Sequence, residues 1–306
     1  MQAPIMADAA PITIVLVHGA CHGGWCWYKV AARLRSSLAA ASFRVLTPDL
    51  AASGVDERRL REVPTFRDYT APLLDLLRSL PDGEKAILVG HSLGGLSVAL
   101  AAEEHPEKVA AAVFLCAFMP DCTSPPSHGL LKVIERMHRF ASMNEFLMGN
   151  GLLNEKFVVF RIQHPYGTIE SNRDVPQLDN EIKPPDNDGK LPASFMFGPQ
   201  TIEQNVYQLC SNEDKTLAKS LMRVGSLFLE DLNIQKPLSK DRYGSVRKVY
   251  IVAEQDRAIS EGLQRWMVSN NPVEEVKEIE TADHMAMIST PDDVAQYIVD
   301  ITKNYN

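Results

Sequence analysis

The stretch GHSLGG (residues 90–95) follows directly on the apolar run AILV (residues 86–89) and precedes a segment with helical spacing, residues 96–105. It contains the pattern G-x-S-x-G between an expected strand and an expected helix, the context in which the pattern indicates a nucleophilic serine. Glycines are needed at both flanks because the turn is so tight that side chains there would collide with backbone. We therefore expect Ser92 in a strained conformation at the carboxyl edge of a sheet, beside a helix N-terminus. The alternative is a glycine-rich loop that binds phosphate or no ligand.

Short β-rich runs alternate with helical patterns along much of the chain, as in βαβ units. Most of the runs are continuously apolar, which is typical of a parallel sheet buried on both faces. The expected strands are Ile12–His18, Phe43–Thr47, Ala86–Val89, Val109–Leu115, Arg247–Ala253 and Val276–Ile279. The expected helices are Trp27–Leu38, Tyr69–Leu80, Leu96–His105, Ser260–Val268 and Pro291–Lys303. This order predicts an α/β fold with a mostly parallel central sheet flanked by helices.

The alternation stops between residues 120 and 243, where helical segments are separated by a polar, proline-bearing run. A long excursion between two strands of a sheet is typical of an inserted cap. We predict a core of residues 12–119 and 244–306, a mostly helical cap of residues 120–243 with a long polar loop near 163–192, and a disordered tail of residues 1–11. The helical cap segments are expected at Gly129–Phe140 and Glu213–Val224.

A serine nucleophile requires a general base and an acid that orients it, in the chain order serine, acid, histidine for this strand–turn–helix context. Of the eight histidines, His284 follows the last expected strand, so its loop reaches the same sheet edge as Ser92. Asp256 follows the strand that ends near Ala253 and is the preferred acid. Two rivals stay open at this point, Glu254 close by and Asp121 after the preceding strand.

Ester hydrolysis also requires hydrogen-bond donors for the developing oxyanion, worth about 3 kcal/mol each. The backbone N–H of Leu93, directly after the nucleophile, is one candidate. The N–H of Ala20, in the glycine-rich segment HGACHGGW (residues 18–25), is the other. The cysteine and histidine spacing in that segment supplies no set of four ligands, so we predict no metal site.

Composition restricts the partners that the protein could have. The chain of 306 residues has a formal net charge of -8 and a pI near 5.5. Nucleic acids and anionic membranes select clustered positive charge, so we expect neither as a partner. Five cysteines without paired motifs indicate free thiols in a reducing compartment. We read the chain as a cytoplasmic protein without a signal peptide or a transmembrane segment.

The motifs taken together resemble the plant methylesterase and hydroxynitrile lyase family of the α/β-hydrolase superfamily. The segments that carry the resemblance are VLVHGACHGGWCWYKV, TPDLAASGVD, ILVGHSLGGLSVALA, GSLFLEDL, YGSVRKVYIVAEQD and ADHMAMISTP, among others, and they extend over nearly the whole chain. The resemblance implies an α/β-hydrolase fold and a cofactor-free carboxylesterase for small methyl esters of plant signalling acids such as salicylate, jasmonate or indole acetate. It further implies a possible homodimer.

The same resemblance assigns Ser92, Asp256 and His284 as the triad, with Ala20 and Leu93 as the oxyanion hole. It also places His91, Phe197 and Leu227 in the lining of the substrate pocket. Apolar residues of the cap favour a hydrophobic acyl group. They are Leu130, Met137, Phe140, Phe195 and Met196.

Two substrate-binding positions separate the esterases of this family from its lyases. The similar lyases carry Thr or Asn where this chain has Gly19, and one group of them has Lys where it has Met285. A hydroxyl or amide and an ammonium can bind a cyanohydrin oxygen and a cyanide leaving group, whereas glycine and methionine cannot. Both positions favour the esterase. The alternatives are a hydroxynitrile lyase or other lyase on the same triad, and a hormone-binding receptor without catalysis.

Overall fold

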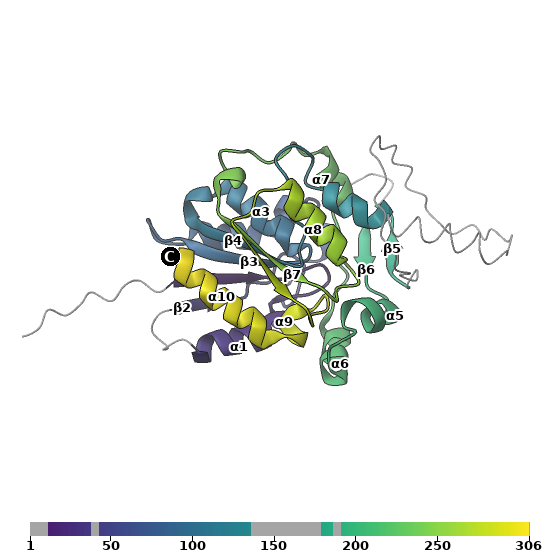
Figure 1. Ribbon diagram of the computed structural model, residues 1–306. Coiled ribbons are helices and arrows are strands. Elements are labelled where there is room, and N and C mark those ends of the chain that lie inside the picture. Colours follow the sequence, from purple (N-terminus) through teal and green to yellow (C-terminus); the bar gives the residue numbers. More distant parts are fainter. Residues whose placement is uncertain (1–11, 38–42, 136–178, 186–190, 306) are drawn as a thin grey trace, which may run out of the picture.

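The computed structural model describes residues 12–37, 43–135, 179–185 and 191–305. Its centre is a six-stranded sheet in the order β2-β1-β3-β4-β7-β8, in which all neighbouring strands are parallel (Figure 1). The strands are β1 (Ile12–Val17), β2 (Phe43–Leu46), β3 (Ala86–His91), β4 (Val109–Leu115), β7 (Lys248–Ala253) and β8 (Glu275–Ile279). The predicted α/β fold with a parallel central sheet flanked by helices is confirmed.

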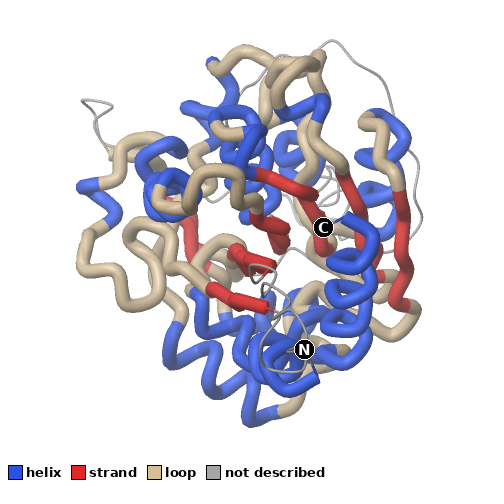
Figure 2. Tube along the Cα trace, turned by 90° about the vertical axis from the view of Figure 1, so that its left-hand side faces the viewer, coloured by secondary structure: helices blue, strands red, loops and turns tan. Residues whose placement is uncertain are grey.

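Side chains of the central strands alternate between two apolar cores, one on each face of the sheet. On β3, Ala86 and Leu88 enter one core, and Ile87 and Val89 enter the other. The first core is covered by α2 (Phe66–Arg78), α3 (Gly94–Glu104) and α8 (Glu261–Asn270). The second is covered by α1 (Tyr28–Ser37), α9 (Ala286–Ser289) and α10 (Pro291–Tyr305). Figure 2 shows the strands passing between helices on both sides. Burial on both faces explains why most of these strands are continuously apolar.

The helices of the core follow the predicted pattern, with shifts at their ends. The largest shift is at α2, which begins at Phe66 rather than Tyr69 because the Thr65 side chain accepts a hydrogen bond from the backbone N–H of Asp68 and caps the helix. Short helical turns connect the larger elements. They are Gly24–Trp27, Leu60–Glu62, Pro106–Lys108 and Tyr243–Ser245. No helix within the described ranges is both long and apolar enough to cross a bilayer.

The segment between β4 and β7, which we call the cap, contains both helical elements and short strands. They are a helical segment at 128–135, β5 (Glu181–Lys183), β6 (Ser194–Met196), α5 (Pro199–Thr201), a π-helical turn (Ile202–Val206), α6 (Asn212–Leu221) and α7 (Leu229–Ile234). The expectation of a loop throughout residues 163–192 was wrong at β5, which pairs antiparallel with β6. β5 has three residues, all exposed, and is too short for apolar alternation to predict it as a strand.

Several predictions concern residues whose structure is not described. The N-terminal tail of residues 1–11, the cap residues Met137 and Phe140 and most of the polar run of residues 163–192 lie outside the described ranges. Of the other apolar cap residues, Leu130 and Phe195 are buried and Met196 is half-buried.

Candidate active site

Ser92 lies at the sharp turn between β3 and α3. Its φ is +53°, a left-handed conformation that is strained for any residue with a side chain. The flanking glycines are required by close backbone contacts: a Cβ at Gly90 would lie 2.7 Å from the carbonyl oxygen of Gly94, and a Cβ at Gly94 would lie 2.5 Å from that of His18. Backbone hydrogen bonds keep Ser92 in this conformation, since its carbonyl accepts from the N–H groups of Gly95 and Phe118.

The structure brings Ser92, His284 and Asp256 into one chain of hydrogen bonds. The distance from Ser92 Oγ to His284 Nε2 is 3.1 Å, and that from His284 Nδ1 to Asp256 Oδ2 is 2.8 Å. Ser92 and Asp256 follow β3 and β7, and His284 lies in the loop between β8 and α9, so all three stand at the carboxyl edge of the sheet. Because the carboxylate only accepts, His284 carries its proton on Nδ1 and offers Nε2 to the serine hydroxyl. This arrangement can remove the hydroxyl proton as Ser92 attacks a carbonyl.

Of the three acids considered from the sequence, Asp256 is the one that contacts His284. Glu254 instead lies 3.7 Å from the guanidinium of Arg265. Asp121 accepts hydrogen bonds from the backbone N–H groups of Thr123 and Ser124, in its own turn. The choice among the acids therefore depends on the path of the loop after β7.

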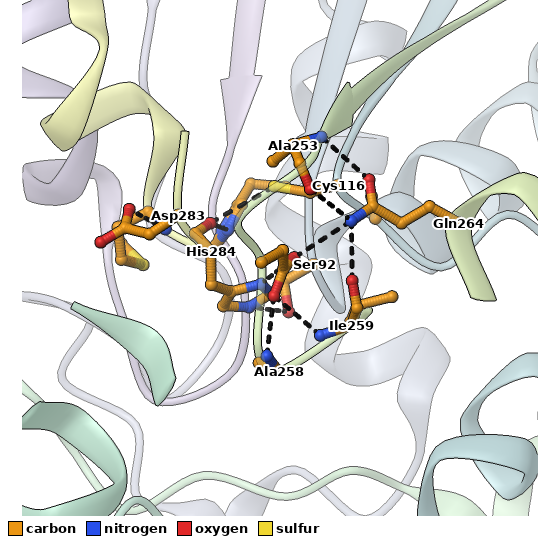
Figure 3. A network of polar contacts seen from close by, with 12 residues as sticks. Ser92, Cys116, Ala253, Ala258, Ile259, Gln264, Asp283 and His284 are labelled. Atoms are coloured by element: carbon orange, nitrogen blue, oxygen red, sulfur yellow. Dashed lines mark hydrogen bonds and ion pairs between the residues drawn. The ribbon is translucent and has the colours of Figure 1, made fainter. Parts of the chain in front are cut away.

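Gln264 on α8 organises the loop that carries Asp256 (Figure 3). Its side chain, fully buried, bonds to both the N–H and the carbonyl of Ala253 and donates to the carbonyl of Ile259. The N–H groups of Ala258 and Ile259 in turn each donate to Asp256 Oδ1, both at 2.8 Å. Oδ1 is thus occupied by backbone donors, while Oδ2 faces the imidazole and also accepts a longer hydrogen bond, of 3.5 Å, from Gln264 Nε2. Sequence reasoning missed Gln264, because nothing in its own segment distinguishes it from the other polar residues of the helix.

The backbone of His284 is held by two further side chains. His91 Nε2 lies 2.7 Å and Cys116 Sγ 3.3 Å from the carbonyl oxygen of His284, and both side chains are buried. Ligand atoms of His91, Cys116 and His284 lie within 4.8 Å of one another, a spacing compatible with a metal. However, the donors of His91 and Cys116 converge on a carbonyl oxygen, so the group has a role in holding this loop.

Asp283 connects the same loop to the cap. Its carboxylate accepts hydrogen bonds from the N–H of Leu209 at 2.8 Å and from the hydroxyl of Ser289 at 2.8 Å. Burial raises the pKa of Asp283 above its usual range. Because Leu209 lies between the π-helical turn and α6, its hydrogen bond to Asp283 directly joins the loop of His284 to the cap.

The two expected oxyanion donors lie in segments that adjoin Ser92. Leu93 follows Ser92 directly, and the loop that holds Ala20 is adjacent, since a Cβ at Gly19 would lie 2.8 Å from Ser92 Cβ. Within the described part of the chain, neither the Ala20 nor the Leu93 N–H donates to another backbone group. Both are therefore free to bind an oxygen that forms on the substrate.

The expected pocket residues fall into two groups. Phe197 and Leu227 come from the cap and are half-buried, and Phe197 packs edge-on against His22 with ring centroids 6.2 Å apart. His91 and Met285 are buried, at 1% and 0% exposure, and Met285 packs in the second apolar core. Their contact with a substrate stays a prediction.

Three histidines close to the site are buried and neutral. His18, His22 and His91 are at most 2% exposed. Burial lowers the pKa of all three, that of His22 to about 3. In the unfolded chain each would regain an ordinary pKa of about 6.5.

We expect the protein to lose stability as the pH falls below about 6.5. In that range the unfolded chain binds protons on these imidazoles that the native state does not bind, so the free energy of unfolding decreases with decreasing pH. For His22 alone, a native pKa of about 3 corresponds to a loss of about 2 kcal/mol between pH 7 and pH 5. Denaturant unfolding at the two pH values measures the loss.

The matched control is His22→Asn, which removes this titration. Between pH 7 and pH 5, the free energy of unfolding of this variant should fall by about 2 kcal/mol less than that of the wild type. Equal losses in the two proteins would contradict the assignment of His22 as a neutral buried group.

Comparisons with known proteins identify similar chains and a similar fold. Residues 14–297 match the model of the alpha/beta hydrolase family. The chain is 43% identical to salicylic acid-binding protein 2 of Nicotiana tabacum, over 95% of this chain and 97% of that one. It is 42% identical to methylesterase 1 of Arabidopsis thaliana, over 95% and 96%. Its fold matches the crystal structure of polyneuridine aldehyde esterase with a TM-score of 0.79 and 36% identity, over 95% and 99%.

Proposed function

The chain belongs to the alpha/beta hydrolase family, within the branch that holds the plant methylesterases, and on this basis we propose that it is a serine carboxylesterase that hydrolyses small methyl esters of plant signalling acids. The observation that carries the proposal is the chain of hydrogen bonds from Ser92 Oγ through His284 to Asp256, at 3.1 and 2.8 Å. A hydroxyl activated in this way serves acyl transfer.

The proposed reaction has two steps that share the same groups. Ser92 Oγ attacks the ester carbonyl while His284 Nε2 takes its proton, and the N–H groups of Ala20 and Leu93 bind the oxyanion. His284 then protonates the departing methoxide, so methanol leaves and an acyl-serine remains. In the second step water attacks this acyl group, His284 takes the water proton and returns it to Ser92, and the free acid is released.

The substrate class is supported by the apolar residues that we expect to line the pocket and by the names of the relatives. Phe195, Phe197 and Leu227 of the cap are apolar, which suits the hydrocarbon part of an acid. Relatives named methylesterase 1 and methyl jasmonate esterase 1 are 42% and 39% identical to this chain. We therefore propose methyl salicylate, methyl jasmonate and methyl indole acetate as the first substrates to test.

Gly19 and Met285 favour hydrolysis over cyanohydrin cleavage. At position 19 an added Cβ would lie 3.1 Å from His91 Nδ1 as well as against Ser92, so glycine keeps the space beside the nucleophile open for the ester. Met285 supplies a buried thioether where a lyase of this type would use an ammonium for cyanide.

The test is a panel of the three methyl esters and mandelonitrile, assayed with the full chain and with Ser92→Ala. We expect methanol release from at least one ester and none above background in the variant. Cleavage of mandelonitrile to benzaldehyde and cyanide without ester turnover would replace the proposal by a lyase. Tight binding of the free acids without any turnover would replace it by a hormone-binding receptor, a role that a relative named for salicylic acid binding brings into the comparison.

A further inference from the structure

Two successive carbonyl groups of the loop that carries Ala20 are each bound by an imidazole. His18 Nδ1 lies 2.9 Å from the carbonyl oxygen of Gly19, and His22 Nδ1 lies 2.7 Å from that of Ala20. Because a carbonyl oxygen only accepts, both imidazoles must carry their proton on Nδ1. The peptide groups before and after the Cα of Ala20 are thus both restrained by side chains.

The far nitrogen of each imidazole accepts a hydrogen bond that fixes this tautomer. The N–H of Leu50 donates to His18 Nε2 at 3.0 Å, and the hydroxyl of Tyr207 donates to His22 Nε2 at 2.7 Å. Tyr207 follows the π-helical turn of the cap, is fully buried, and stacks on His22 with the ring planes 14° apart. The neutral state of both imidazoles agrees with the pKa values lowered by burial.

The His18 bond restrains the peptide group that contains the Ala20 N–H, and the His22 bond restrains the next peptide group, on the other side of the Ala20 Cα. The peptide group is planar and trans, so the N–H of Ala20 points away from the carbonyl of Gly19. The next residue, Cys21, has a φ of +63°, which is unfavourable for a residue with a side chain and persists only where neighbours hold it. The carbonyl of Cys21 accepts a hydrogen bond from the backbone N–H of Arg223 in the cap at 3.0 Å. The loop is therefore held in an unfavourable conformation from the side of the cap.

We propose that His22 and Tyr207 are positioning residues for transition-state stabilisation, and that the cap acts through them to orient the Ala20 N–H toward the oxyanion. The inference rests on the proposed esterase function. The inference gives Tyr207 a role in catalysis although the Tyr207 hydroxyl binds His22 rather than a reacting atom. Loss of one oxyanion donor typically lowers kcat by about 10²- to 10³-fold, so a donor that is present but poorly aligned should cost roughly 10- to 100-fold.

The test compares three variants for hydrolysis of the best methyl ester of the panel. Tyr207→Phe removes only the hydroxyl, and we expect kcat to fall about 10-fold with KM within about twofold. His22→Leu removes the donor to Ala20, and the expected fall is roughly 100-fold. His22→Asn places an amide N–H near the former Nδ1 and should recover most of that loss.

A trifluoromethyl ketone analogue of the ester separates positioning from general damage. It adds to a serine nucleophile and forms a hemiketal oxyanion, so its affinity should weaken in the variants in proportion to kcat. Affinity for the product acid should be unchanged. Tyr243→Phe is the matched control, since this tyrosine is buried like Tyr207 but donates its hydroxyl to the backbone carbonyl of Pro120, away from Ala20. Its kcat should stay within about twofold of the wild type.

The outcomes distinguish this inference from the proposed function. If the wild type hydrolyses the ester and the His22 and Tyr207 variants keep both their kcat and their affinity for the ketone, the inference is wrong and the esterase stands. An equal loss of ketone and product-acid affinity would likewise overturn it, because it would indicate a collapsed site. If the wild type hydrolyses no ester, the proposed function fails and the inference falls with it.

Discussion

Replacing Ser92 with alanine is expected to lower kcat for methyl ester hydrolysis roughly 10⁵- to 10⁶-fold. Alanine keeps the backbone and Cβ of the turn and removes only the oxygen that would attack the carbonyl. His284 and the oxyanion donors stay in place, so the product acid should bind to the variant as it does to the wild type. Steady-state methanol release and the shift in thermal unfolding caused by the acid measure the two effects separately.

Ser92→Gly is a second inactive variant that separates catalysis from stability. At a φ of +53°, glycine avoids the steric cost that alanine and serine bear, so this variant should be more stable than Ser92→Ala by roughly 1 kcal/mol. Both should be equally inactive. Appreciable hydrolysis by either variant would exclude Ser92 as the nucleophile.

Replacing Asp256 with asparagine is expected to lower kcat about 10⁴-fold. The backbone N–H groups of Ala258 and Ile259 both point at the Oδ1 position, so the amide oxygen must stay there and the NH₂ group must face His284. An amide donor opposite Nδ1 forces the imidazole proton onto Nε2. His284 can then no longer accept the proton of Ser92. Steady-state kinetics over a range of pH measure the loss.

Glu254→Gln is the matched control for Asp256→Asn. Glu254 lies two residues earlier in the same loop and was the closest rival from the sequence, but it lies beside Arg265 rather than His284. Its kcat should stay within about twofold of the wild type, because it touches none of the reacting groups. A larger loss in Glu254→Gln than in Asp256→Asn would contradict the assignment of the acid.

The features that sequence predicted well are those set by local pattern. Continuous apolar runs identified the central strands because a strand buried on both faces has no polar positions. The pattern around Ser92 identified the turn, since contacts of Gly90 and Gly94 with the backbone exclude any side chain at these positions. The strand β5 was missed because its three exposed residues pair only with a partner further along the chain.

The groups that support the site are set by contacts between distant parts of the chain. His22 and Tyr207 are 185 residues apart, and Cys116 and His284 are 168 apart. Gln264 looks in the sequence like any polar residue of a helix, yet it is fully buried and holds the loop of Asp256. A pattern in one segment carries no information on which distant hydroxyl or thiol will meet it.

The sequence by itself determined the succession of strands and helices along the core of the chain and the turn that carries Ser92. It also determined the sheet edge at which Asp256 and His284 had to be sought. Local sterics and the burial of apolar runs suffice for that. Only the tertiary structure decided which of three acids meets the imidazole and which residues hold the Ala20 loop. These depend on how loops from separate strands and the cap pack together, where a shift of one ångström makes or breaks a hydrogen bond.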